Sequence, residues 1–465
     1  MAHILISAAH KSSGKTTISV GLAAALANTG LQVQTFKKGP DYIDPMWLGR
    51  ATERPCRNLD FYTMSQKEIL GSFARYSHGA DFSLIEGNKG LFDGLDLDGS
   101  NSNAALATLV QAPIVLVIDA RGMTRGIAPL ILGYQAFDPS LNIAGIILNK
   151  VGGPRHEKKL RAIIKHYTDV PVLGAVHKDE RLEIPERHLG LTPSNETPEA
   201  LAKIDTIAEL IADQVDLDAV RKIADKAIPP ATTKVSPKQI TAEITIGIAK
   251  DSAFGFYYPG DLEALEEAGA SLINIDMIKD SEIPQIDGLF IGGGFPETYM
   301  AELEGNKSMM KSVRQAIEDG LPAYAECGGL MYLARSLTWH GKTHKMAGVI
   351  PGDIVMHDKP QGRGYVRLRE TGKGPWLLTD AGEISAHEFH YSSLENLEGD
   401  FDFAYEVLRG HGIDANHDGL VYKNLLTGYA HLRDVEANPW AARFANFVKS
   451  CKQTQRQELP SRGTV

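Results

Sequence analysis

SAAHKSSGKTT, at residues 7–17, sets the architecture of the first half of the chain. It follows a strand-like apolar run at 3–7 and precedes a helical pattern at 18–27. A strand, a turn containing Gly-Lys and a helix, in that order, are the context that a phosphate-binding loop requires. The pattern G-x-x-x-x-G-K-[ST] is met except at its first position, where Ala9 replaces glycine. The sequence therefore predicts a loop that binds phosphate through backbone N–H groups at a helix start.

Individual residues of this loop have separate expected roles. Lys15 is placed to contact the β- and γ-phosphates of a nucleotide, and Thr16 to hold Mg²⁺. An ordinary polar turn is the plain alternative, but GKTT directly after a strand is a specific signal. The deviant loop of partition-type ATPases fits less well, because His10 stands where its additional lysine would be. We expect the nucleotide to be bound by Ser12, Ser13, Gly14, Lys15, Thr16 and Thr17.

Short apolar runs alternate with longer amphipathic ones around this loop, which is typical of repeated βαβ units. Strands are predicted at 3–7, 32–36, 82–85, 114–118 and 143–148. They indicate an α/β fold with a doubly wound parallel sheet.

A Pro- and Thr-rich stretch, PPATTKVSPK at 229–238, then indicates a linker. A second α/β pattern follows it, with strands at 244–249, 271–275, 288–291 and 323–326 and helices at 260–268 and 307–319. We therefore assign an ATP-binding domain at 1–226, a linker at 227–242, a second α/β domain at 243–450 and a flexible tail at 451–465.

Acidic side chains gather at the predicted carboxyl ends of strands. Glu86 ends the buried run at 82–85, and Asp93 follows in a glycine-containing loop. The stretch KKGPDYIDP, at 37–45, places two lysines and two aspartates after another strand. Ligands bind at this edge of a parallel sheet. Each acid alone would be read as a turn residue, but together they predict an Mg²⁺ site formed by Thr16, Asp44 and Glu86.

A thiol stands at the corresponding place in the second α/β pattern. Cys327, in AECGG at 325–329, lies between the predicted strand at 323–326 and a helix predicted at 330–336. A nucleophile on a tight strand-to-helix turn is exposed at a helix start. The plain alternative, a buried small hydrophobe, fits poorly with the polar, Gly-rich surroundings. Cys327 is therefore a candidate nucleophile.

Two further motifs can serve this thiol. GGGFPE, at 292–297, also follows a strand, and the backbone amides of Gly293 and Gly294 could form an oxyanion hole. A base has to come from elsewhere in the sequence, and His431 in GYAHL, at 428–432, is the best candidate. HEFHYS, at 387–392, does not have the spacing of H-E-x-x-H, so we expect substrate or interface contacts from it in preference to zinc.

Composition excludes several classes of protein. A formal net charge of −10 argues against nucleic-acid binding, which needs a basic surface. No apolar stretch approaches the ~20 residues that a membrane helix needs, and no secretory signal precedes the first strand. Three scattered cysteines are too few for a disulfide framework. We therefore expect a cytoplasmic protein, and the sequence leaves a homodimer open.

Taken together, the motifs resemble the cobyrinic acid a,c-diamide synthase family, whose members are class I glutamine amidotransferases fused to a dethiobiotin-synthetase-like ATPase domain. FKKGPDYIDP, at 36–45, and HEFHYS are the most specific of the matching stretches. Others, spread over almost the whole chain, are SSGKTT at 12–17, RPCRNLD at 54–60, GYQAFDP at 133–139, GIILNKVG at 145–152, PERHLGL at 185–191, GGGFPE, AECGGLMYL at 325–333 and GYAHL.

The resemblance implies a two-site enzyme. A class I glutaminase-like domain would hydrolyse glutamine through a thioester at Cys327, with His431 as base, and release ammonia. The P-loop domain would use ATP and Mg²⁺ to phosphorylate a carboxylate of a tetrapyrrole, and ammonia would displace the phosphate. The matching positions in the family's motifs would assign Lys38, Asp41, Tyr42 and Asp93 to the substrate and synthetase site.

Several positions depart from the family's usual pattern. Ala9 starts the phosphate loop, and Arg433 stands where the family often has a second histidine. The family commonly works with a Cys–His pair and no firm acidic partner, so Arg433 is compatible with activity. The stretches 86–103 and 124–129 look unlike those of the corrinoid-making majority.

Three alternatives to the diamide synthase therefore stay open. One is a relative with the same two domains that amidates sirohaem or nickel-sirohydrochlorin. Another is cobyric acid synthase, which HEFHYS and FKKGPDYIDP disfavour. The last, from another class, is a P-loop ATPase switch with an inert second domain, which would have no need of Cys327.

Overall fold

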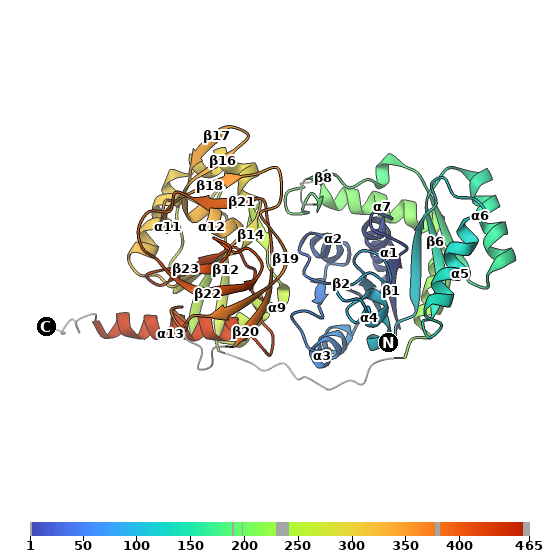
Figure 1. The fold of residues 1–465 in the computed structure, drawn as a ribbon, viewed down its shortest axis with the longest axis horizontal. Helices are drawn as coiled ribbons and strands as arrows, with labels where there is room; N and C mark the ends of the chain where they lie inside the picture. The colour runs from blue at the N-terminus through green and yellow to red at the C-terminus, as the bar shows by residue number, and fades with distance from the viewer. Residues whose placement is uncertain (1, 188–189, 198, 229–240, 377–381, 459–465) are drawn as a thin grey trace. The chain divides into compact units, whose positions relative to one another are not determined.

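The computed structural model describes residues 2–187, 190–197, 199–228, 241–376 and 382–458 (Figure 1). The chain divides into two compact units, Met1–Ser236 and Pro237–Val465. The division falls inside the predicted linker at 227–242, of which residues 229–240 lie outside the described ones. Each unit has its own sheets and its own hydrophobic cores.

The described strands of the first unit are β1 Ala2–Ala8, β2 Val33–Lys38, β3 Arg57–Leu59, β4 Phe82–Glu86, β5 Ile114–Asp119, β6 Ile143–Val151, β7 Val172–His177, and the short pair β8 Glu186–Arg187 and β9 Gly190–Leu191. Its helices are α1 Lys15–Asn28, α2 Ile43–Thr52, α3 Gln66–Ser77, α4 Asn103–Val110, α5 Ile127–Phe137, α6 Pro154–Tyr167, the 3₁₀ turn η1 Glu180–Leu182, α7 Ala200–Gln214 and α8 Leu217–Ala224.

A parallel seven-stranded sheet in the order β3-β2-β4-β1-β5-β6-β7 is the frame of this unit. The chain begins in the middle of the sheet and extends it in both directions, so the doubly wound fold is confirmed. All five predicted strands are present, as β1, β2, β4, β5 and β6. The sequence analysis missed β3 and β7; β3 is short and carries Arg57 and Asn58, which are poor strand signals.

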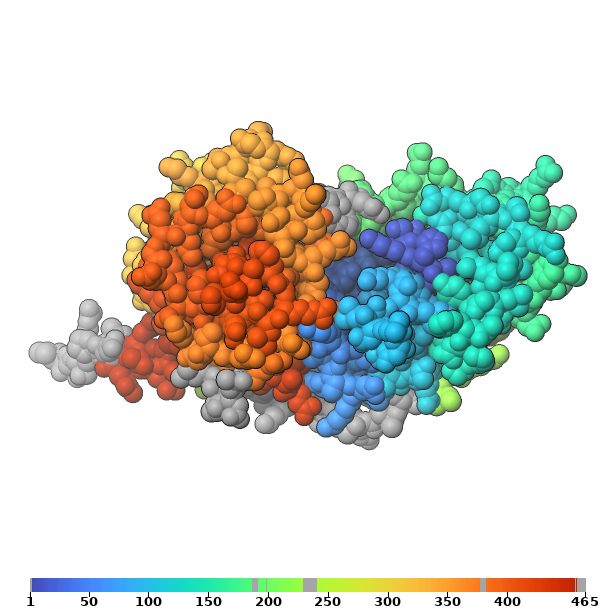
Figure 2. All heavy atoms as spheres, viewed as in Figure 1, coloured from blue at the N-terminus to red at the C-terminus, as the bar shows by residue number. Residues whose placement is uncertain are grey.

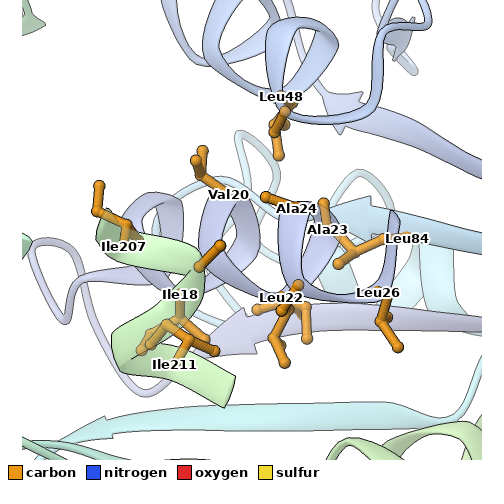
Figure 3. Close-up of a cluster of buried hydrophobic side chains, with 14 of the residues drawn as sticks. Ile18, Val20, Leu22, Ala23, Ala24, Leu26, Leu48, Leu84, Ile207 and Ile211 are labelled. Atoms are coloured by element: carbon orange, nitrogen blue, oxygen red, sulfur yellow. The ribbon is translucent and has the colours of Figure 1, made fainter. Parts of the chain in front are cut away.

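Two hydrophobic clusters cover the two faces of this sheet. Ile4 and Ile6 of β1 point into one cluster and Leu5 into the other, as the alternation of side chains along a strand requires. Helix α1 is buried continuously from Ile18 to Leu26, because α2 and α7 pack against it (Figure 3). This packing fixes the start of α1, and with it the phosphate loop, against the sheet.

The strands of the second unit are β10 Ile244–Ala249, β11 Phe254–Phe256, β12 Ala270–Ile275, β13 Gly288–Ile291, β14 Gly293–Gly294, β15 Ala323–Glu326, β16 Ala334–Trp339, β17 Lys342–Lys345, β18 Ile350–Met356, β19 Gly362–Glu370, β20 Glu383–His390, β21 Ser392–Glu395, β22 Asp402–Arg409, β23 His417–Tyr422 and β24 Leu425–Gly428. Its helices are α9 Pro259–Glu267, the 3₁₀ turn η2 Pro296–Tyr299, α10 Met300–Gly305, α11 Lys307–Glu318, α12 Gly328–Leu333 and α13 Trp440–Glu458.

The main sheet of this unit is mixed. Strands β12-β10-β13-β15-β24 run parallel, and the sheet continues through β23, β22, β19 and β20 in antiparallel pairs. A smaller sheet, β17-β16-β18-β21, lies beside it. The orange-to-red atoms that dominate the visible face of this unit in Figure 2 belong to the part of the chain after β17, which includes α13. The predicted α/β class is confirmed, and the parallel half carries the predicted thiol motif.

Two boundaries differ from the prediction. The helix predicted at 330–336 is α12, which ends at Leu333, because the next residues form β16 and pair with both β17 and β18. The tail predicted from residue 451 is helical as far as Glu458. Lys452 explains the difference, since its Nζ donates to Asp287 Oδ2 at 2.8 Å and to the Glu243 carbonyl at 2.9 Å. Residues 459–465 lie outside the described ones.

No helix in the described part of the chain has the length and apolar character needed to span a lipid bilayer.

Candidate functional site

The phosphate loop joins β1 to α1 at the centre of the parallel sheet. Its left-handed backbone positions are Ser12 (φ 64°) and Gly14 (φ 85°), not Ala9, so alanine at the start of the motif is compatible with the loop. A Cβ on Gly14 would lie 2.2 Å from Asn149 Nδ2, which donates to the Ser13 carbonyl at 2.9 Å. Gly14 is therefore required both by its backbone conformation and by the close approach of Asn149.

Lys15 is the first residue of α1, and Thr17 lies half-buried in the same turn. The Lys15 Nζ donates to the carbonyl of Lys89 at 2.6 Å. Burial, helped by repulsion from Lys37, lowers the pKa of Lys15 to about 8. The loop thus presents a buried ammonium group next to the backbone N–H groups of a helix start, which is an arrangement suited to phosphate.

The three predicted metal ligands lie together. The Thr16 hydroxyl is 2.8 Å from Glu86 Oε1 and 3.2 Å from Asp44 Oδ2, and either oxygen can accept a hydrogen bond from it. Lys37, on β2, lies between the two acids and donates to Asp44 Oδ2 at 2.5 Å and to Glu86 Oε1 at 2.8 Å. Its side chain is only 3% exposed. Lys37 was in a quoted motif but was not predicted as a site residue.

Burial and mutual interaction shift the pKa values of the charged groups in this cluster. Burial opposes the charge of Lys37, but Asp44 and Glu86 raise its pKa well above the usual value. Burial raises the pKa of Glu86, while the Lys37 ammonium group, acting against burial, keeps the pKa of Asp44 below its usual range. The second oxygen of Glu86, Oε2, is buried and has no hydrogen-bond partner within the described residues. An unpartnered carboxylate oxygen beside a second carboxylate and a hydroxyl fits a hard cation such as Mg²⁺.

Among the described residues, no three His, Cys, Asp or Glu side chains are grouped to hold a metal ion. The ligand set at this site would therefore consist of two carboxylates, from Asp44 and Glu86, and the hydroxyl of Thr16. Asp41 has a different position, 3.9 Å from Lys37 Nζ. Its Oδ1 accepts the backbone N–H groups of Ile43 and Asp44, so Asp41 also fixes the start of α2.

The other predicted synthetase residues border the loop that follows β4. Lys38 Nζ donates to Asn88 Oδ1 at 3.2 Å, and burial lowers the pKa of Lys38 to about 8. Asp93 Oδ2 accepts the N–H of Gly90 at 2.8 Å. Tyr42 is buried immediately before α2. The loop after β4 thus carries Asp93 and also meets Lys38.

Asn103, at the start of α4, holds that loop in place. Its Nδ2 lies within hydrogen-bond distance of the carbonyls of Asn88 (2.5 Å) and Gly90 (2.9 Å) and of Ser7 Oγ (3.1 Å). Its Oδ1 accepts the N–H of Asn88 at 3.1 Å. The sequence analysis missed Asn103, because a lone asparagine at a helix start reads as a cap residue.

Cys327 stands on the turn between β15 and α12. Its backbone has φ 52° and ψ −103°, an unfavourable conformation for a residue with a side chain, and its N–H donates to the Gly428 carbonyl at 2.7 Å. A Cβ on Gly329 would lie 2.3 Å from the Ile291 carbonyl, so only glycine allows this turn to approach β13. The residue as a whole is 7% exposed. A strained strand-to-helix turn is a common way to present a nucleophile.

His431 lies close to this thiol. Its Nδ1 is 3.1 Å from Glu326 Oε1, and the second oxygen of Glu326 accepts the Tyr324 hydroxyl at 2.8 Å. The imidazole also shares a hydrogen bond with Cys327. Burial opposes protonation of His431, but the charges on Glu326 and Cys327 raise its pKa to about 10. The arrangement favours an imidazolium at His431 next to the Cys327 sulfur, as in a nucleophile and base pair.

Glu326 is thus an acidic partner for His431, whereas the sequence analysis expected none. Sequence reasoning missed Glu326 because it directly precedes Cys327 and lies far from His431 in the chain. No sequence spacing links an acid at this position to His431. The structure brings them together because β15 and β24 are neighbouring parallel strands, with Glu326 opposite Gly428.

The predicted oxyanion loop borders both residues. A Cβ on Gly328 would lie 2.9 Å from the backbone nitrogen of Gly294, so this amide is next to the turn that carries the thiol. A Cβ on Gly293 would lie 2.6 Å from His431 Cε1. The two glycines therefore allow the loop to lie against the nucleophile and its base, as an oxyanion hole requires.

The substrate or interface contacts that we expected from HEFHYS stay a prediction, but three of its residues lie in the interior. His387, Glu388 and His390 are all buried inside the second unit. Glu388 accepts the backbone N–H groups of His411 (2.7 Å) and Gly412 (2.8 Å), so it holds a turn. The sequence pattern could not distinguish this internal role, because alternate residues of a strand at the edge of a mixed sheet can face either solvent or a neighbouring layer.

The resemblance implies glutamine hydrolysis at this site, and replacing Glu326 with glutamine should lower the kcat of that reaction by about 10–100-fold. The neutral amide would no longer stabilise the His431 imidazolium, and the pKa of His431 would fall toward the ordinary histidine range. Glutamate release by the full-length protein measures this effect, and an unchanged thermal unfolding curve shows that the second unit is folded. A variant with the kcat of the unmodified enzyme would show that Glu326 has no part in orienting the base.

Two family models match the chain. Residues 4–191 match the CobQ/CobB/MinD/ParA nucleotide-binding domain, and residues 245–438 match the CobB/CobQ-like glutamine amidotransferase domain. Each match covers one of the two sites described above.

Full-length relatives are also found. The cobyrinate a,c-diamide synthase of Magnetococcus marinus is 46% identical, with 96% of each chain covered. Those of Methanosarcina acetivorans and Listeria innocua are 41% and 40% identical, covering 93% and 86% of this chain and 92% and 88% of theirs. Among solved structures, a GMP synthase component from Thermoplasma acidophilum matches with a TM-score of 0.35 and 18% identity, covering 46% of this chain and 98% of its own.

Proposed function

The chain belongs to the cobyrinate a,c-diamide synthase family, and from this premise we propose that it converts the a and c acetate carboxylates of cobyrinic acid, or of a close tetrapyrrole, into carboxamides. It is a carbon–nitrogen ligase with glutamine as the amido donor. The observation that carries the proposal is the presence, in one chain, of a buried Cys327–His431–Glu326 arrangement and a phosphate loop beside clustered carboxylates.

Glutamine hydrolysis would take place in the second unit. The thiolate of Cys327 attacks the side-chain amide carbon of glutamine and forms a C–S bond. The backbone N–H of Gly294 faces the oxyanion that develops, and His431 protonates the nitrogen so that ammonia leaves. Water, deprotonated by the same imidazole, then attacks the thioester carbon; the C–S bond breaks, glutamate leaves, and the thiolate and the imidazolium are restored.

Activation of the acceptor would take place in the first unit. A carboxylate oxygen of the tetrapyrrole attacks the γ-phosphorus of ATP, the bond to the β-phosphate oxygen breaks, and ADP leaves. Lys15 and the backbone N–H groups of the phosphate loop hold the transferred charge. Ammonia then attacks the acyl phosphate carbon and expels phosphate, with loss of a proton. Phosphorylation is required because a carboxylate oxygen is otherwise too poor a leaving group.

Thr16, Asp44 and Glu86 would hold Mg²⁺ in this site. When bound, the ion would neutralise phosphate charge during transfer. Lys38 and Asp93 would border the acceptor carboxylate, because both lie at the loop after β4. A cytoplasmic location and a homodimer stay predictions of the sequence.

An amidase of sirohaem or nickel-sirohydrochlorin is the second candidate within the same chemistry. The stretches 86–103 and 124–129, which depart from the family's usual pattern, favour it. A nucleotide switch with an inert second unit is supported less well, because it gives no reason for a strained Cys327 next to a charged imidazole.

Incubation with ATP, Mg²⁺, glutamine and a panel of tetrapyrrole carboxylates, followed by mass spectrometry, tests the proposal. We expect cobyrinic acid to yield mono- and diamide products, each amidation lowering the mass by about 1 Da. Amidation of sirohaem or nickel-sirohydrochlorin alone would establish the second candidate. ATP hydrolysis without an amide product from any acceptor would contradict both.

A further inference from the structure

His387, in the HEFHYS motif, lies directly against the catalytic base proposed above. The rings of His387 and His431 are nearly parallel, at 18°, with centroids 4.9 Å apart. The backbones of the two residues are also joined, because the N–H of His431 donates to the His387 carbonyl at 2.8 Å and that of His387 to the His431 carbonyl at 3.4 Å. A strand distant in sequence thus supports one face of the His431 ring.

His387 is itself fixed in its position. The Tyr258 hydroxyl lies 3.3 Å from His387 Nδ1, and the His387 side chain is buried. Burial, then the charge on His431 and that on Arg433, lower the pKa of His387 well below the usual value. Arg433 in turn lies over the Tyr258 ring, at 4.9 Å from its centroid. His387 is therefore a neutral, immobilised ring.

Three contacts together determine the orientation of the His431 ring. Glu326 holds Nδ1, and Gly293 approaches the Cε1 edge so closely that a Cβ there would be 2.6 Å away. His387 covers one face. Since Nδ1 is occupied by Glu326, Nε2 is the nitrogen left to exchange a proton with Cys327.

We propose that His387 is a positioning residue for glutamine hydrolysis: its neutral ring stacks on His431 and keeps Nε2 of the base aimed at Cys327. The inference rests on the glutaminase function proposed above and deepens it. A ring that is held in one orientation can deliver its proton to the nitrogen of the departing group without first having to reorient. HEFHYS thus supports the base from a second strand.

The test compares two substitutions of the same residue in the full-length protein. His387→Ala removes the stacked face, whereas His387→Phe restores a planar ring of similar area without the nitrogens. We expect His387→Ala to lower the kcat of glutamine hydrolysis by about 10–100-fold with the KM for glutamine within about twofold, because misplacement of a catalytic group affects the reaction more than substrate binding. His387→Phe should recover the kcat to within about fivefold of the unmodified enzyme.

His390 offers a matched control on the same strand. It is equally buried, but it stacks on Tyr429, at 3.8 Å, and not on His431. His390→Ala should leave the kcat of glutamine hydrolysis within about threefold. Thermal unfolding of all three variants should follow the curve of the unmodified enzyme, which establishes that the second unit, where both histidines lie, is folded.

Three results would overturn the inference: a normal kcat in His387→Ala, equal losses in His387→Ala and His387→Phe, or an equal loss in His390→Ala. Failure of the underlying glutaminase assignment is recognised separately, because in that case Cys327→Ala would still hydrolyse glutamine. If Cys327→Ala is inactive and His387→Ala is normal, only the role of His387 is wrong.

Discussion

Replacing Cys327 with alanine should abolish glutamine-dependent amide formation, by at least ~1000-fold, and leave ammonia-dependent amide formation intact. Without the thiolate no thioester can form, and the remaining imidazole and oxyanion loop contribute little alone. The carboxylate-activating step is unaffected, because the phosphate loop belongs to a different compact unit with its own core. Amide product, measured by mass spectrometry with glutamine and then with ammonium chloride as donor, gives both rates.

Cys451→Ala is the matched control. Cys451 is a half-exposed cysteine on α13, and the described contact of its sulfur is with Asn424 Nδ2 at 3.9 Å. This variant should retain both activities. If Cys327→Ala kept glutamine-dependent activity, the nucleophile would have to be another group. If it lost the ammonia-dependent activity as well, the separation into two reaction centres would be wrong.

Replacing Lys15 with alanine should lower amide formation by at least ~100-fold with either donor, while glutamine hydrolysis persists. The substitution removes the buried ammonium group at the start of α1, which would contact the transferred phosphoryl group. Release of ADP and of glutamate, measured in the same reaction, separates the two half-reactions. We expect ADP release to fall with amide formation.

Lys11, an exposed lysine in the same loop, provides the control for Lys15. Lys11→Ala should reduce amide formation by less than about threefold. Equal losses in the two variants would favour the deviant phosphate loop that the sequence analysis set aside. Unchanged amide formation in Lys15→Ala would remove the phosphate loop from the mechanism.

Local patterns allowed the sequence to predict the parts of each site that lie within one motif. The order strand, GKTT and helix defines the phosphate loop without knowledge of any distant residue, and AECGG does the same for Cys327. Thr16, Asp44 and Glu86 could be grouped because parallel strands end at the same edge of a sheet. The structure places the Thr16 hydroxyl within hydrogen-bond distance of both Asp44 and Glu86.

Contacts between motifs could not be predicted in the same way. Glu326 reaches His431 only because β15 and β24 become neighbours, and no spacing in the sequence records that pairing. Lys37 was recognised as part of a basic and acidic block, but its position between Asp44 and Glu86 depends on how α2 folds back over β2. His387 seemed available to a substrate because its strand could not be assigned to the interior of a mixed sheet.

Transfer of nitrogen from glutamine to an ATP-activated carboxylate, within one chain, is the claim on which the account depends. It is tested most directly with glutamine labelled with ¹⁵N at the amide, together with ATP and the tetrapyrrole that the panel identifies. We predict that each new carboxamide carries ¹⁵N, in amounts equal to the ADP and glutamate formed. Hydrolysis of ATP and glutamine without labelled amide, or amide formation without ADP, would contradict the account.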